Sequence, residues 1–217
     1  VQGVDPASNI ASIAEKRGIE TICAFFDMDT ATKIVETKGK ASVITATNVF
    51  AHIDDLNSFM AAVQFLLEDS GVLIIEAPYF LNLVNNLEYD TIYHEHLSYL
   101  SVKPLVRFFK KFGMEVFDIQ EVDIHGGSFR IFAARESQMR TSEAVARMLE
   151  AEESMELHSP RFLENFSDAV VENRQELRQL LDSSKRAGDR IVAVSAPAKG
   201  MTLLNYCGIG KDTLDYV

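Results

Sequence analysis

Residues 41–78, ASVITATNVFAHIDDLNSFMAAVQFLLEDSGVLIIEAP, decide the fold class, because two apolar runs flank a segment with helical spacing. We expect a strand over 41–50, then a helix that ends on Gly71, then a strand over 72–78. The apolar run at 41–50 is typical of a strand buried on both faces of a parallel sheet. This alternation of strand and helix predicts a doubly wound α/β sheet.

The same alternation extends toward the N-terminus. A short strand precedes Asp5 and Pro6, and the helix after it places Ile10 and Ile13 on one face. A second strand is expected over 20–26 and a second helix over 30–39. These units would continue the parallel sheet on one side.

Toward the C-terminus the pattern changes at Pro78. Residues 79–101 are rich in aromatic and polar side chains without a regular period, which is typical of a functional segment. A helix follows at 102–113, and two strands joined through the sequence HGG predict an antiparallel hairpin that closes the sheet. The first domain is therefore expected to span 1–137.

A second domain is predicted for 138–217. It starts with a long, charged, amphipathic helical stretch over 141–187, broken at Pro160. The segment RIVAVSAPAKGMTLLNYCG then predicts a new strand, turn and helix, and the sequence TLDYV reads as the start of another strand. We expect this second α/β domain to be incomplete.

Composition excludes several classes of protein. The 217 residues are 47% hydrophobic and carry a formal net charge of −11, which suits a globular chain and disfavours contact with nucleic acid or anionic membranes. The two cysteines lie far apart, and no apolar run approaches the ~20 residues that span a bilayer. We expect a cytoplasmic monomer with reduced thiols.

The strongest local motif is YHEH at residues 93–96, set among aromatic and apolar residues. A neutral imidazole oriented by a carboxylate can remove a proton from carbon, and a nearby phenol can stabilise the enolate that forms. His96 is the candidate base, with Glu95 and Tyr93 in the supporting roles. Two alternatives remain open: zinc binding by His94 and His96, and histidines that only cap a loop.

Polar residues also follow the predicted strands, where ligands of parallel sheets bind. Asp5 ends one strand and could accept hydrogen bonds from ribose hydroxyls, or could cap the helix after it. Asn48 ends another strand, and His52 follows four residues later. Both are expected near the reacting centre, and either could be only a capping group.

Two glycine-containing turns could hold an anionic group. The first contains His125, Gly126, Gly127 and Ser128, with Arg130 just beyond, and a plain hairpin turn explains its glycines equally well. The second, APAKG, places Lys199 at the start of a helix, where backbone amides meet anions. Its spacing is not that of a P-loop.

Taken together and in order, YDTIYHEHLSYLS, HGGSFRIFAAR and SAPAKGMTLLNYCGIG closely resemble the nucleotide-sugar C-methyltransferases that build branched deoxysugars. The resemblance runs over nearly the whole chain. It implies a Rossmann-like methyltransferase sheet, S-adenosylmethionine as cofactor and a nucleotide-linked keto sugar as substrate. In that family a zinc-binding domain precedes this sheet and an α/β domain follows it. We expect no metal site within these residues.

The resemblance also assigns roles. His96 would remove the proton next to the sugar ketone, supported by Glu95 and Tyr93. Asp5 and Asn48 would contact the cofactor. The side chains expected to surround the sugar nucleotide are Asn48, His52, His125, Gly126, Gly127, Ser128, Arg130, Lys199 and Asn205.

The chain departs from the family pattern in one respect. The glycine-rich strand and turn that cradle the methionine end of the cofactor, which precede the Asp5 strand in the family, are not among these residues. The resemblance places that strand between the strands that end at Asp5 and at Asn48. We expect that these 217 residues alone do not turn over substrate. Two alternatives to the C-methyltransferase are a non-catalytic sugar-nucleotide-binding fragment and an O-methyltransferase on the same fold.

Overall fold

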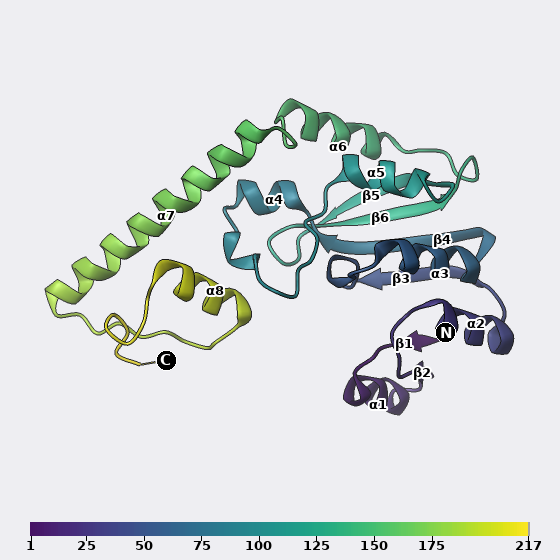
Figure 1. Ribbon diagram of the computed structural model, residues 1–217, viewed down its shortest axis with the longest axis horizontal. Helices are drawn as coiled ribbons and strands as arrows, with labels where there is room; N and C mark the ends of the chain where they lie inside the picture. The colour runs from purple at the N-terminus through teal and green to yellow at the C-terminus, as the bar shows by residue number, and fades with distance from the viewer. Residues whose placement is uncertain (217) are drawn as a thin grey trace.

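The computed structural model describes residues 1–216 and centres on a four-stranded mixed sheet (Figure 1). Its strands lie in the order β3-β4-β6-β5. The parallel pair is β3 (Ala41–Thr47) with β4 (Leu67–Pro78). The antiparallel hairpin is β5 (Met114–Val122) with β6 (Ser128–Arg135), and β6 also pairs antiparallel with β4. The predicted α/β class and the closing hairpin are both confirmed.

One face of this sheet carries the main core. The helices α3 (Leu56–Leu66) and α5 (Val102–Lys110) lie against the sheet, and α6 (Glu143–Ser154) runs beside α5 (Figure 1). Both α3 and α5 pack apolar side chains inward. The largest fully buried side chains of the sheet and of these layers include Phe50, Phe109, Phe129, Leu73 and Ile131. Burial of such aliphatic and aromatic surface is the main force that holds the layers together.

The N-terminal units form a separate two-stranded parallel sheet. Strand β1 (Gly3–Val4) pairs with β2 (Thr21–Ile22), and helix α1 (Ser8–Lys16) connects these two strands. Helix α2 (Met28–Lys38) follows β2 and leads to β3. Among residues 1–216, no strand pairing joins this sheet to β3. A small cluster of Ala31, Ile34, Ala62 and Leu66 attaches α2 to α3 instead. The break lies where the family resemblance places a further strand.

Several expected elements differ in extent. The helix predicted to end on Gly71 ends at Leu66, and residues from Leu67 onward join β4. Strand β2 covers only Thr21–Ile22 of the predicted 20–26. Strand β3 was predicted to be buried on both faces, but it is an edge strand of its sheet and Val43 is 54% exposed. Apolar composition reports a tendency to be buried and does not specify which neighbour covers the strand.

The segment after β4 is mostly irregular, as expected. It contains the short helix α4 (Phe80–Asn85) and the 3₁₀ turn η2 (Tyr89–Thr91), and an earlier 3₁₀ turn, η1 (Phe50–His52), follows β3. These three short elements lie at the end of the sheet to which the β3 and β4 arrowheads point (Figure 1).

The C-terminal part is helical. Helix α7 (Pro160–Ala187) starts with Ser159 capping the amide of Phe162 and ends at Gly188 in the left-handed conformation. Helix α8 (Ala198–Cys207) folds back beneath it (Figure 1). The strand expected near residue 192 is reduced to one parallel bridge between Val192 and Tyr216. In the described part of the chain, no helix is both long and apolar enough to cross a membrane.

Candidate active site

His96 is placed by a backbone anchor to the turn η1. The amides of Leu97 and Ser98 both donate to the carbonyl oxygen of Ala51, at 2.9 and 3.1 Å. Ala51 and its neighbour Phe50 are buried in the core, so this anchor is rigid. As a result the rings of His52 and His96 lie 5.0 Å apart, centroid to centroid.

The imidazole of His96 is oriented through one nitrogen. Its Nδ1 lies 2.8 Å from the carbonyl oxygen of Thr91. A carbonyl only accepts, so Nδ1 carries the proton and, in the neutral ring, Nε2 is left with a free lone pair. Nε2 faces the phenol oxygen of Tyr93 at 3.4 Å. This tautomer is the one a base acting through Nε2 requires.

The other members of the motif differ from expectation. Glu95 and His94 are exposed, and neither makes a side-chain hydrogen bond to His96 within the described chain. The orienting group is therefore the Thr91 carbonyl and not the predicted Glu95 carboxylate. Glu95 acts on Tyr93 instead: burial first, and then the charges of Glu95 and Asp90, raise the pKa of the Tyr93 phenol. A phenol with a raised pKa stays protonated and can donate.

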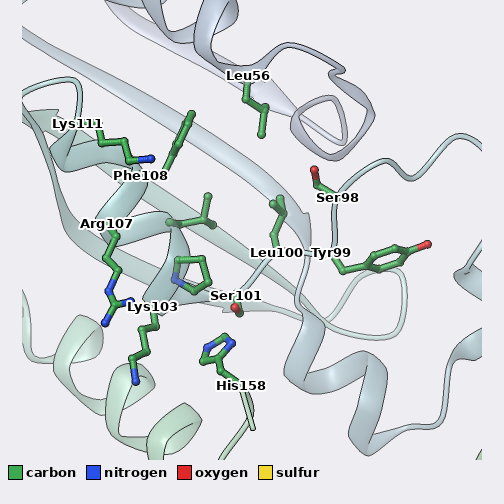
Figure 2. A pocket seen from close by; sticks show the side chains of 12 residues that line it. Leu56, Ser98, Tyr99, Leu100, Ser101, Lys103, Arg107, Phe108, Lys111 and His158 are labelled. Carbon is green, nitrogen blue, oxygen red and sulfur yellow. The ribbon is translucent and has the colours of Figure 1, made fainter. Parts of the chain in front are cut away.

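Two hollows flank the segment 98–100. A hollow of about 20 Å³, close to the size of one water molecule, lies between His96, Thr91 and Phe80. A second, of about 750 Å³, lies along α5, where Lys103, Arg107 and Lys111 form its basic wall (Figure 2). Ser98, Tyr99 and Leu100 line both, so this segment separates them.

The carboxyl ends of β3 and β4 bring Asn48 close to an ion pair. Asn48 has a positive φ of 53°, and its amide donates to the carbonyl oxygen of Glu76 at 2.8 Å. The side chain of Glu76 is buried and accepts from Arg130 Nε at 3.0 Å. Arg130, which was predicted to contact the substrate, is therefore paired with a carboxylate on the neighbouring inner strand β4.

Asp5 lies at the end of β1, in the separate N-terminal sheet. Its Oδ1 accepts the amide of Ala7 at 2.8 Å, and the N-cap of α1 is Ala7 itself. Asp5 thus shapes the turn before the helix without capping it. Its second oxygen, Oδ2, has no hydrogen bond within residues 1–216 and is available to a ligand.

The HGGS turn packs closely on the loop that follows β4. Gly126 and Gly127 have φ values of 83° and 113°, which favour glycine. A Cβ on Gly126 would clash with the carboxylate of Glu88, and one on Gly127 would clash with Asn82. The positive φ favours glycine at both positions, and at Gly127 the contact with Asn82 adds a steric reason. The sequence alone did not indicate Glu88 and Asn82, because what distinguishes them is their contact in the fold with Gly126 and Gly127, about 40 residues away in the chain.

The remaining residues of this turn have plain structural partners. The Oγ of Ser128 donates to the carbonyl oxygen of Ile124 at 3.0 Å, and Asn86 Nδ2 donates to that of Gly126 at 2.9 Å. His125 is exposed and has a φ of 53°. The turn is therefore fixed by hydrogen bonds from the side chains of Ser128 and Asn86 to its backbone, and His125 is exposed to solvent.

Lys199 and Asn205 both lie on α8, Lys199 in the first turn and Asn205 near the end. The helix packs against η2, the turn that supplies the carbonyl partner of His96. Within the part of the chain that the structure describes, no cluster of three or more His, Cys, Asp or Glu side chains is placed to hold a metal ion.

Two models of known protein families match this chain. A family model described as a methyltransferase domain matches residues 1–119. The chain belongs to this family of methyltransferase domains. A second model, described as a C-methyltransferase C-terminal domain, matches residues 123–217.

Among curated proteins, the chain is 36% identical over 217 residues to the C-methyltransferase NovU of Streptomyces niveus. That alignment covers 100% of this chain and 52% of NovU, so the chain spans about half the length of this relative.

Similar solved structures include an S-adenosylmethionine-dependent methyltransferase from Anabaena variabilis, with a TM-score of 0.48, 15% identity, and coverage of 63% of this chain and 68% of that one. Another is magnesium protoporphyrin IX methyltransferase from Synechocystis, with a TM-score of 0.45, 13% identity, and coverage of 63% and 64%. The family membership rests on the family model and not on these distant folds.

Proposed function

We propose that this chain forms the catalytic part of an S-adenosylmethionine-dependent C-methyltransferase that acts on a nucleotide-linked keto sugar. One observation carries the proposal: His96 is held in the tautomer that frees Nε2, with the Tyr93 phenol beside that nitrogen. The match to a C-methyltransferase C-terminal domain and the similarity to NovU support carbon as the methyl acceptor.

In the proposed reaction Nε2 of His96 takes the proton from the sugar carbon next to the ketone, so the C–H bond breaks and an enolate forms. Tyr93 donates a hydrogen bond to the enolate oxygen. When bound, S-adenosylmethionine supplies an electrophilic methyl group. The enolate carbon bonds to that methyl as the methyl–sulfur bond breaks, and the proton on His96 then passes to solvent.

The cofactor contact we propose is made by Asp5. Its free Oδ2 stands at the carboxyl end of β1, where a carboxylate can accept hydrogen bonds from ribose hydroxyls. Oδ1 already holds the turn, so binding needs no rearrangement of the loop. Asn48 is proposed to line the site from the end of β3.

The substrate contacts we propose come from both parts of the chain. His52 stands next to His96 at the sugar, and the HGGS turn and Arg130 lie at the adjacent end of the sheet. Lys199 and Asn205 on α8 supply positive charge and an amide for the nucleotide. On a chain with a net charge of −11, a phosphate group needs such local cations.

The function is tested with the full-length natural protein, methyl-labelled (¹³C) S-adenosylmethionine and a thymidine-diphosphate 4-keto-6-deoxy sugar. We expect a product whose labelled methyl carbon shows one-bond carbon–carbon coupling to the sugar. An O-methyl product, without that coupling, would instead support the O-methyltransferase. Binding of the sugar nucleotide without methyl transfer would support the non-catalytic alternative.

A further inference from the structure

The orientation of His96 depends on a turn that does not belong to the sheet. Thr91, whose carbonyl oxygen holds Nδ1 of His96 at 2.8 Å, ends the three-residue turn η2. The hydrogen bonds within this turn are all local: both the amide and the hydroxyl of Thr91 donate to the carbonyl oxygen of Glu88. Such a short turn requires a partner from elsewhere in the fold to stay fixed.

That partner is the C-terminal part of the chain, which meets η2 at Tyr89. The phenol of Tyr89 donates to Oδ1 of Asn173 on α7 at 2.9 Å and lies 3.7 Å from Sγ of Cys207 on α8. The ring also packs edge-on against Tyr206, with centroids 5.4 Å apart. Tyr89 is 7% exposed and Cys207 is 1% exposed, so water does not replace these contacts.

Helices α7 and α8 are themselves tied together beside Tyr89. Arg178 Nη1 on α7 donates to the carbonyl oxygen of Gly208, which ends α8, at 2.5 Å. The guanidinium of Arg174 lies 5.3 Å from the centroid of the Tyr206 ring. Tyr89 is therefore held between two helices that also hold each other, and Figure 1 shows α8 beside the loop that contains η2.

We infer that Tyr89, Asn173 and Cys207, here called the Tyr89 cluster, are positioning residues that fix the tautomer of His96 from the C-terminal part of the chain. Only Asp90 separates Tyr89 from Thr91, so a displacement of Tyr89 moves the Thr91 carbonyl. A shift of about 1 Å takes a 2.8 Å hydrogen bond beyond bonding distance. Without that acceptor, the proton is free to occupy Nε2, which then cannot act as a base.

The inference also connects the two halves of the proposed site. Lys199 and Asn205, proposed to bind the sugar nucleotide, stand on the same helix as Cys207. The end of α8 that contacts Tyr89 is thus rigidly joined to the proposed substrate contacts. The catalytic consequence rests on the proposed function, whereas the effect on the tautomer does not.

The test is ¹⁵N NMR of the full-length protein labelled only at histidine, at about pH 9, since protonated and unprotonated ring nitrogens differ widely in chemical shift. His96→Gln assigns the signals. We compare Tyr89→Phe and Asn173→Leu, which remove the donor and the acceptor, with Asn173→Asp, which keeps an acceptor oxygen.

We expect a single Nδ1-protonated form of His96 in the parent protein and in Asn173→Asp, and a mixture of both tautomers in Tyr89→Phe and Asn173→Leu. The signals of His158, whose ring contacts Glu152 and not this cluster, and the thermal midpoint serve as the control for folding. An unchanged Nδ1-protonated His96 in Tyr89→Phe and Asn173→Leu would overturn the inference.

A second measurement separates this inference from the proposed function. We expect kcat for methyl transfer to fall about 10- to 100-fold in Tyr89→Phe with little change in KM for the sugar nucleotide. If the tautomer shifts but the parent protein transfers no methyl group, the positioning inference stands and the proposed function fails. If methyl transfer occurs and the tautomer does not shift, only the inference fails.

Discussion

The phenol of Tyr79 donates a 3.1 Å hydrogen bond to Oε1 of Glu152, a carboxylate with 0% exposure. The same carboxylate accepts the backbone amides of Val102 and Lys103 at the start of α5, at 2.5 and 2.9 Å. Burial and the Glu152 charge together raise the pKa of the Tyr79 phenol. Glu152 therefore joins the end of β4, the start of α5 and α6, on which it lies.

We predict that Glu152→Ala lowers the free energy of unfolding by about 3–5 kcal/mol, because two buried donors and the half-buried amide of Lys103 lose their acceptor. Glu152→Gln keeps one acceptor oxygen and should cost less. Urea denaturation measures both, with the exposed Glu150→Ala as the matched control on the same helix. Equal stability of the Glu152 and Glu150 variants would contradict the role of this carboxylate.

The cap of α3 predicts a change of stability with pH. Asp55 accepts hydrogen bonds from Ser58 Oγ, Ser58 N and Asn57 N, and these, Ser58 foremost, lower the pKa of its carboxyl below 3.8. A lowered folded pKa stabilises the protein above the unfolded pKa, and this contribution is lost as the pH falls through the folded value. Between about pH 5 and pH 3, urea denaturation should show a smaller loss of stability in Asp55→Asn than in the parent.

The matched control is the exposed neighbour Asp54→Asn, whose acid response should follow the parent protein. If Asp55→Asn loses as much stability in acid as the parent does, the cap does not contribute as described.

For the cofactor we predict that Asp5→Asn raises KM for S-adenosylmethionine about 10-fold or more, through loss of a charged acceptor for a ribose hydroxyl. Asparagine keeps an oxygen for the amide of Ala7, so the thermal midpoint should stay close to that of the parent. Asp5→Ala removes both contacts and should lower the midpoint as well. An unchanged KM in Asp5→Asn would assign this residue to the turn alone.

Much of the fold was predictable because its signals are local. The hairpin of β5 and β6 and the break at Pro160 both follow from neighbouring residues. The end of α3 was misplaced because its apolar residues run without interruption into β4, so periodicity does not separate helix from strand there. The exposure of β3 depends on its position at the sheet edge, which no local pattern encodes.

In the candidate site, too, only the contacts between residues close in sequence were predictable. Tyr93 and His96 are three residues apart and meet, as the motif indicated. The group that orients His96 is the backbone carbonyl of Thr91. Every residue has a backbone carbonyl, so the identity of residue 91 does not indicate this contact. Glu88, which packs on Gly126, and Asn173, which binds Tyr89, come from distant parts of the chain and required the fold to be found.

We predict that Tyr93→Phe lowers kcat for methyl transfer by about 100-fold, because the enolate oxygen loses its hydrogen-bond donor. The packing of the ring against His96, with centroids 4.4 Å apart, should survive, so KM should change little. Tyr99→Phe is the control: Tyr99 lies farther from His96, at 6.4 Å between centroids, and should retain activity. Steady-state kinetics would contradict the role of Tyr93 if both variants behaved alike.

The central claim is that Nε2 of His96 removes a proton from the substrate carbon. It is tested most directly by following deuterium exchange at that carbon in D₂O, with S-adenosylhomocysteine in place of the methyl donor. We predict that His96→Gln slows exchange about 10²- to 10⁴-fold while the exposed His94→Gln exchanges at the parent rate. Exchange at the parent rate in His96→Gln would contradict the account, because the base would then be another group.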